Sequence, residues 1–224
     1  VGGNLQVNAG TVNFGRDTSN NIVSLSVAGT TTISGGTVNI RSSTDSTFGA
    51  VSMAGGAFNL AYLSGISART ISVASLEGNG GTIGQTTTGT GYVTTLAITG
   101  SATKEYSGTI SNGTGTSSIA VTKSGAGVQT LSGSNTYASG TTVSAGTLLV
   151  NNTTGSGLGT GDVAVNGGTL GGTGSFTGKV TVNDGGTMAP GAGIESLGAG
   201  GVTFTGGAFA FELNTSGSPT ADLL

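Results

Sequence analysis

The chain alternates apolar and polar residues in short runs, and Gly, Asn or Ser interrupts these runs every few positions. In residues 5–14 (LQVNAGTVNF), apolar residues occupy alternate positions on both sides of Gly10. A period of two is typical of a β-strand with one buried face, and Gly or Asn between two such runs predicts a turn. The runs are too short for helices. The pattern therefore predicts short strands joined by tight corners.

The same strand, corner and strand recur along the chain, at residues 33–40, 51–60, 143–150, 163–170, 180–188 and 202–211. The corner glycines recur at a loose but similar spacing, first at Gly10, Gly36 and Gly56 and later at Gly146, Gly168, Gly186 and Gly207. A repeat of roughly 20 residues is typical of a solenoid, in which each coil buries its apolar face against the next. We predict an all-β solenoid of roughly ten coils over residues 1–224, as a single domain. Residues 84–92 are polar and Gly-rich and predict a large corner or loop, with a domain boundary as the alternative.

The repeat assigns individual residues to the interior and to the corners. The predicted core comprises Val12, Phe14, Val38, Ile40, Phe58, Leu60, Leu131, Val143, Leu148, Val150, Leu170, Met188, Phe204, Phe209 and Phe211. The predicted corners comprise Gly10, Gly36, Gly56, Gly81, Gly125, Gly127, Gly133, Asn135, Gly140, Gly146, Gly168, Gly186 and Gly207. Tyr62, Tyr106 and Tyr137 are expected outside, where an exposed aromatic strip could stack on carbohydrate.

Composition narrows the functional classes. The chain has no Cys and no His, which excludes disulfides, thiolate metal sites and the usual zinc ligand sets. Its six basic residues are scattered, whereas nucleic-acid binding needs clustered Lys and Arg. No apolar run approaches the ~20 residues of a membrane span. We expect no cofactor, no nucleic-acid partner and no membrane span.

The acidic residues do not predict a catalytic centre. Asp17, Asp45, Glu77, Glu105, Asp162, Asp184, Glu195, Glu212 and Asp222 stand singly along the chain, mostly beside Gly or Asn. Polysaccharide-cleaving β-helices need clustered carboxylates or metal ligands on one face, so we do not expect an enzyme. Residues 159–165 are faintly similar to a calcium-binding β-roll repeat, but one imperfect copy favours a turn before a strand.

Residues 121–152 carry the most specific motif. Its residues are Thr122, Lys123, Gly125, Gly127, Leu131, Gly133, Asn135, Thr136, Tyr137, Gly140, Thr141, Gly146 and Leu148. The segment resembles the autotransporter-associated β-strand repeat, also called the passenger-associated transport repeat. Ser139 stands where the family has the first Gly of a pair. The resemblance implies a right-handed parallel β-helix in a bacterial surface or secreted protein, and it supplies no catalytic residues.

Two functions fit these expectations. The first is an extracellular fibre or surface stalk that polymerises end to end, because neither end of the sequence carries the polar cap that a solenoid needs. A continuation of the solenoid within a longer chain would explain the same feature. The second function is the shaft or passenger region of an autotransporter-like adhesin that binds surfaces or glycans.

Overall fold

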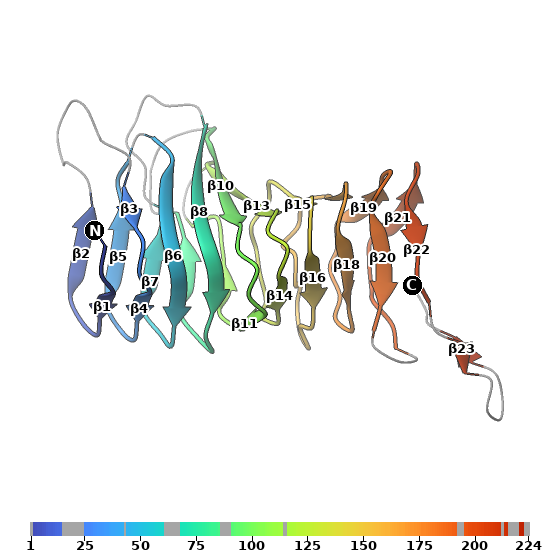
Figure 1. The fold of residues 1–224 in the computed structure, drawn as a ribbon, viewed down its shortest axis with the longest axis horizontal. Coiled ribbons are helices and arrows are strands. Elements are labelled where there is room, and N and C mark those ends of the chain that lie inside the picture. Colours follow the sequence, from blue (N-terminus) through green and yellow to red (C-terminus); the bar gives the residue numbers. More distant parts are fainter. Residues whose placement is uncertain are drawn as a thin grey trace.

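The chain folds into an all-β parallel solenoid with ~22 residues per turn, seen here in a computed structural model. The structure describes residues 2–14, 25–42, 44–60, 68–85, 91–113, 116–191 and 195–211, and the backbone of two short strands at 213–214 and 220–221. Successive coils stack along the long axis, with the first described strands at one end of the stack and the last strands of the solenoid at the other (Figure 1).

Three parallel sheets form the walls of the stack. The longest sheet contains β1 (Leu5–Val7), β3 (Ser26–Val27), β4 (Thr31–Ile33), β6 (Ser46–Met53), β8 (Ala68–Glu77), β10 (Val93–Ile98), β13 (Ser118–Lys123), β15 (Thr141–Val143), β17 (Val163–Val165), β19 (Lys179–Val182) and β21 (Gly201–Phe204). A second sheet contains β2 (Thr11–Phe14), β5 (Thr37–Ile40), β7 (Ala57–Asn59), β9 (Thr82–Gly84) and β12 (Thr109–Ile110). The third contains β11 (Lys104–Tyr106), β14 (Val128–Leu131), β16 (Thr147–Val150), β18 (Thr169–Gly172), β20 (Thr187–Pro190) and β22 (Ala208–Phe209). A separate antiparallel pair joins β23 (Leu213–Asn214) to β24 (Thr220–Ala221).

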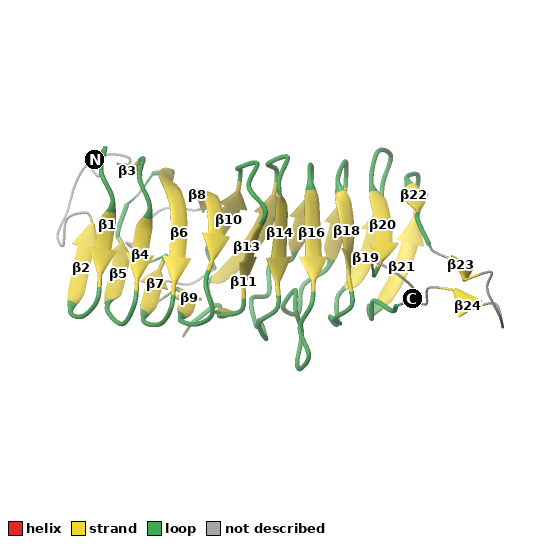
Figure 2. Ribbon diagram, turned by 60° about the horizontal axis from the view of Figure 1, so that its bottom comes forward, coloured by secondary structure: helices red, strands yellow, loops and turns green. Residues whose placement is uncertain are grey.

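Side chains that face inward form a hydrophobic core extending from Val7 to Leu197. Equivalent positions in successive coils lie directly above one another, as in the column of Val38, Phe58 and Ile83. The loops that connect the strands lie along the edges of the stack (Figure 2). Alternation of apolar and polar residues explains this arrangement, because each strand is too short to bury a core without its neighbours.

Polar residues at outward positions also stack in register. The Asn39 side-chain amide donates to the Asn13 amide oxygen at 2.7 Å, and the Asn59 amide donates to Asn39 at 2.8 Å. These three residues occupy the same position in β2, β5 and β7. Identical amides at one register position can satisfy one another, as in stacked cross-β structures.

The stack contains a register step after β8. Val73 in β8 pairs with Ile98, and the next bridge between these two coils joins Gly78, directly after β8, to Tyr106. The chain from Ile98 to Tyr106 is longer than the chain from Val73 to Gly78 that it lies against, and the additional residues are accommodated where the chain turns through residues 99–103. The strand beneath, β8, runs on without a corner. We call residues 74–78 together with residues 99–106 the coil step.

The predicted fold class is confirmed, with about eight turns of ~22 residues instead of roughly ten coils of about 20. The handedness stays a prediction. So does the single-domain organisation, because residues 86–90 of the expected corner at 84–92 lie outside the described part of the chain. Among the described residues, no helix is both long and apolar enough to span a bilayer.

Candidate functional site

The repeat segment, residues 121–152, lies in the middle of the stack and builds parts of two successive coils. It comprises the end of β13, the whole of β14, β15 and β16, and the corners between them. β13 pairs with β15 and β14 pairs with β16, so the segment stacks on itself. Its motif residues therefore meet across neighbouring coils, which explains how a specific spacing could be required.

Lys123 lies inside the stack, although Lys is usually exposed. Its side chain is 1% exposed and occupies the same register position as Ile98 and Val143. The ammonium donates to the carbonyl of Gly125 and, at 3.5 Å, to that of Ala145. Burial lowers the pKa of Lys123. The charge thus binds the backbone of two consecutive corners together.

Gly146 leaves no room for a side chain. It has a φ of +63°, which favours glycine, and a Cβ at this position would collide with the carbonyls of Gly125 and Gly127 in the preceding coil. The same Cβ would also lie 2.7 Å from the Lys123 ammonium. Backbone contact between coils therefore requires Gly here, and the buried cation adds to the crowding.

Asn135 connects three coils from a buried position. Its amide oxygen accepts from the Ile110 backbone N–H at 2.7 Å, and its amide nitrogen donates to the Gly157 carbonyl at 2.6 Å and to the Gly133 carbonyl at 3.3 Å. The side chain is 2% exposed. It replaces regular strand pairing along the third side of the solenoid, where the backbone after β14 is irregular.

Tyr106 and Tyr137 lie inside the stack, so their predicted outward orientation is wrong. Both are fully buried. The Tyr106 hydroxyl donates to the Gly81 carbonyl at 3.0 Å, and the Tyr137 hydroxyl bonds to the Thr141 hydroxyl at 2.7 Å. Burial raises the pKa of both tyrosines, and the Thr141 contact partly opposes this for Tyr137. These internal hydrogen bonds give each buried Tyr hydroxyl a partner and so offset the cost of burying it. Tyr62 lies outside the described residues.

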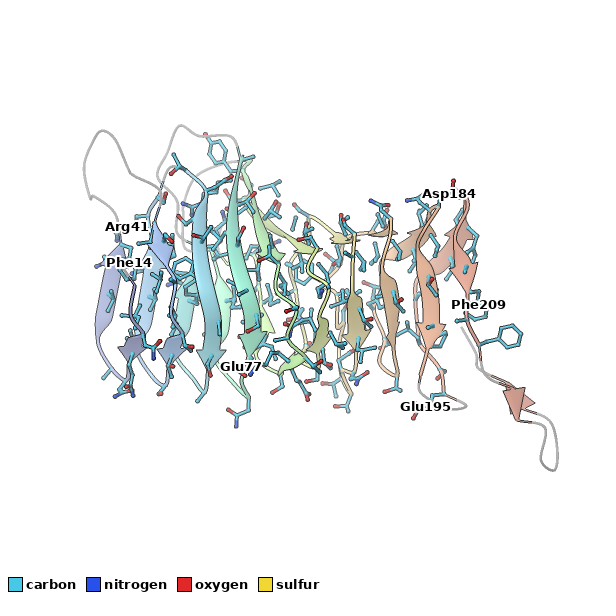
Figure 3. The ribbon with its side chains drawn as sticks, in the orientation of Figure 1. Phe14, Arg41, Glu77, Asp184, Glu195 and Phe209 are labelled. Carbon is cyan, nitrogen blue, oxygen red and sulfur yellow. The ribbon has the colours of Figure 1, made fainter. Side chains whose placement is uncertain are left out.

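Most of the predicted core residues are buried, but those at the ends of the described stack are not. Fully buried are Val38, Ile40, Phe58, Leu60, Leu131, Val143, Leu148, Val150, Leu170 and Met188. Val12, Phe14 and Phe209 are partly buried, and Figure 3 places Phe14 and Phe209 at opposite ends of the stack.

Phe204 and Phe211 correct the predicted core, because they are 42% and 57% exposed. β21 is the last strand of its sheet among the described residues, so no further coil covers Phe204 there. Phe209 contacts both rings, at centroid distances of 6.2 Å and 5.8 Å. The three form an aromatic patch, which we call the terminal patch.

The predicted corner residues all lie between strands. Gly125, Gly127 and Gly133 leave no room for a side chain, because a Cβ on each would collide with the carbonyl of Gly100, Ala102 or Gly108, respectively. Close backbone contact between coils thus accounts for the motif glycines whose φ is ordinary. Ser139, in place of a family Gly, precedes Gly140, which has a φ of +84°.

Three charged residues, Glu77, Lys104 and Glu105, lie at an open pocket beside the coil step. Glu77, Asn79, Lys104, Glu105 and Ser107 line it. Lys104 forms an ion pair with Glu77 at 2.5 Å, and Glu105 accepts from the Ser132 hydroxyl at 2.6 Å. Glu77 and Glu105 thus share a site that sequence spacing did not indicate. Their charged groups are engaged by neighbouring side chains, and Figure 3 shows Glu77 at the edge of the stack.

Two of the remaining described acids, Asp45 and Asp162, accept hydrogen bonds from the backbone of another coil. The Asp45 carboxylate accepts from the Thr70 backbone N–H at 2.7 Å, and that of Asp162 accepts from the Lys179 N–H at 3.0 Å. The Asp162 contact agrees with a turn before a strand at residues 159–165. Within the described ranges, no group of three His, Cys, Asp or Glu residues could hold a metal ion. Asp17, Glu212 and Asp222 lie outside those ranges.

Arg69 and Gln129 are among the buried polar residues that the sequence pattern did not indicate. Arg69 is 4% exposed and donates to the carbonyls of Leu60 at 2.9 Å, Ile40 at 3.3 Å and Ser42. Gln129 is 1% exposed and faces inward. Strand periodicity could have found Gln129, because it lies two positions before the inward Leu131.

Comparison with protein families identifies residues 121–150 as a passenger-associated-transport-repeat. The match covers the two self-stacked coils that contain Lys123, Asn135 and Tyr137. Comparisons with curated proteins and with solved structures found no match.

Proposed function

We propose that this chain forms a non-catalytic structural shaft within the passenger region of an autotransporter-like protein, which is secreted or displayed on a bacterial surface. The observation that carries the proposal is the passenger-associated-transport-repeat at residues 121–150, placed within a continuous parallel solenoid. The shaft would hold an adhesive region away from the cell or would itself contact surfaces or glycans.

The chemistry of the molecule supports a structural role. The buried polar groups of the repeat segment, Lys123, Asn135 and Tyr137, bond to corner backbone or to a neighbouring hydroxyl. Hydrogen bonds of this kind stabilise one arrangement of adjacent coils. Only 7% of the residues are charged, and two of the six basic residues, Arg69 and Lys123, are buried. A stack with few accessible basic residues offers few sites to trypsin-like proteases.

Surface display tests the proposal directly. The chain, with an epitope tag, is placed between a secretion signal and an outer-membrane β-barrel in a bacterial host, and antibody labelling is measured on intact cells. We expect the wild-type chain to be labelled and to be removed by external proteinase K. Asn135→Ala is expected to reduce labelling several-fold, because it breaks hydrogen bonds to three coils.

Asn39→Ala is the matched control. It removes the same side chain from an outward ladder beyond the repeat segment, and we expect it to leave labelling close to wild type. Retention of the wild-type chain in the periplasm would contradict a passenger role. Equal labelling of all three chains would support surface display but would contradict a special contribution of the repeat.

End-to-end stacking is a second candidate, favoured by the terminal patch. Phe204 and Phe211 are exposed on the last described coil of the stack, and exposed aromatic groups beside an open strand edge favour pairing with another chain. Electron microscopy at a resolution that separates the coils tests it. Filaments with the length of one chain as their repeat would support stacking, and isolated short rods would contradict it.

A further inference from the structure

Gln129 is a buried polar residue whose register neighbours are Lys104 in the preceding coil and apolar residues in the following ones. It shares a register position with Leu148, Leu170 and Met188, all of which are buried. A buried amide among apolar side chains is costly unless its hydrogen bonds are satisfied. The position therefore calls for a specific partner.

That partner is the backbone of Leu76, in β8. The Gln129 amide nitrogen donates to the Leu76 carbonyl at 2.8 Å, and the amide oxygen accepts from the Leu76 N–H at 3.3 Å. Leu76 is 53 residues earlier in the sequence. In the stack, β10 and β11 belong to the intervening coil, so the side chain of Gln129 reaches past it.

The coil step explains why Leu76 is reached by a side chain. On one side of it, the Val73 carbonyl accepts from the Thr99 N–H at 2.9 Å, and on the other, the Gly78 N–H donates to the Glu105 carbonyl at 3.0 Å. Between these contacts the intervening coil turns through residues 99–103. A buried strand residue needs partners for both backbone groups. The Gln129 amide supplies one donor and one acceptor to Leu76, as a strand neighbour would, and its nitrogen also donates to the Thr130 carbonyl at 3.0 Å.

We propose that the hydrogen bonds between Gln129 and Leu76, which we call the splice, close the coil step. They couple the coils before the step to the coils after it, so that both unfold as one cooperative unit. In a solenoid each coil ordinarily contacts only its neighbours, so a fault in one interface lets the two sides unfold separately. Gln129 adds a bond between second neighbours at the interface where strand pairing is interrupted. The splice acts on folding whether or not the chain is exported.

Amide exchange measured by NMR tests the splice. In Gln129→Leu, the Leu76 amide is expected to exchange at least about fivefold faster than in wild type, the factor for one lost hydrogen bond. Urea unfolding, followed at residues on each side of the step, is expected to change from one transition to two. Thr130→Ala, a neighbouring substitution that leaves the Gln129 side chain in place, is the control and should change neither measurement.

Two outcomes would overturn the splice. One is unchanged exchange at Leu76 in a folded Gln129→Leu chain, and the other is separate unfolding of the two sides in wild type. Leu is suitable at position 129 because Leu148 and Leu170 occupy the same register position in later coils. Gln129→Asn is a second variant, because its side chain is one methylene too short to reach the Leu76 backbone. If neither variant folds, amide exchange of the wild-type chain in low urea tests the splice instead. Amides of β8 and β14 opening together support the splice, and separate openings refute it.

Discussion

Polar side chains that face inward impose the strictest requirements on single residues. Lys123, Asn135 and Tyr137 each bond to groups that apolar replacements would leave without partners. The cost of a buried unpaired donor or acceptor is about 1–3 kcal/mol. The repeat segment therefore tolerates substitution least at its polar positions, although polar residues are usually the more variable ones in a strand.

The alkaline pH dependence of stability follows from Tyr106 and Tyr137. Burial raises the pKa of each above the ordinary value of 10.0, so the folded state keeps protons that the unfolded state loses. Their stabilising contribution is complete below pH 10.0 and is lost above it. The free energy of unfolding should fall by about 1.4 kcal/mol per pH unit for each tyrosine. Urea titrations between pH 9 and pH 12 measure this slope.

Lys123 acts in the opposite direction and serves as a control. Its folded pKa is lowered from 10.5, so stability rises as pH increases from that lowered value towards 10.5. Tyr137→Phe should flatten the fall above pH 10.0, whereas Lys123→Met should remove only the rise below 10.5. An unchanged alkaline slope in both Tyr106→Phe and Tyr137→Phe would show that the tyrosines do not cause it.

At the scale of elements, corners restrict the sequence more than strands do. Gly10 and Gly56 occupy equivalent corners and have φ values of +75° and +71°. A Cβ on Gly10 meets nothing within 4 Å, whereas one on Gly56 collides with the Gly36 carbonyl of the preceding coil. The two glycines therefore separate the cost of backbone strain from the cost of coil contact.

Alanine substitutions at these corners make the comparison quantitative. Gly10→Ala should lower the free energy of unfolding by about 1–2 kcal/mol, the cost of a left-handed conformation alone. Gly56→Ala should cost more than about 3 kcal/mol, because the Gly36 carbonyl, which accepts from the Ala57 N–H at 2.9 Å, must also move. Urea unfolding monitored by circular dichroism measures both. Equal losses would show that coil contact adds nothing.

Strands and corners were predictable because each depends on a few consecutive residues. Alternation alone places Val38 and Ile83 inside, and Gly between apolar runs marks the corners. The same alternation, counted from Leu131, also places Gln129 and Lys123 inside, but the usual exposure of polar residues argued against it. The coil step was not predictable, because the contact between Leu76 and Gln129 joins residues 53 positions apart.

For the whole molecule, the linear stack makes position along the axis decisive. A residue of one type is buried in the middle and exposed at an end, as Phe58 and Phe204 show. The sequence pattern assigns both to the interior, because alternation shows which side of a strand faces inward. It does not show whether another coil covers that strand. Burial of a residue at the end of the stack depends on what covers the last coil. A shaft and a fibre differ in this respect, because in a fibre a second copy of the chain would cover it.

The terminal patch provides the test that separates them. In Phe204→Ser/Phe211→Ser, two exposed rings are removed, so the free energy of unfolding should fall by only about 1–2 kcal/mol through lost contacts with Phe209. Phe58→Ser, which removes a fully buried ring, should cost about 3–5 kcal/mol.

If chains stack end to end, sedimentation equilibrium will show wild type gaining mass with concentration and the double variant remaining a monomer. Identical self-association of both would place the contact elsewhere on the stack, and a monomeric wild type would favour the shaft, because the exposed rings would then have no partner in a second copy.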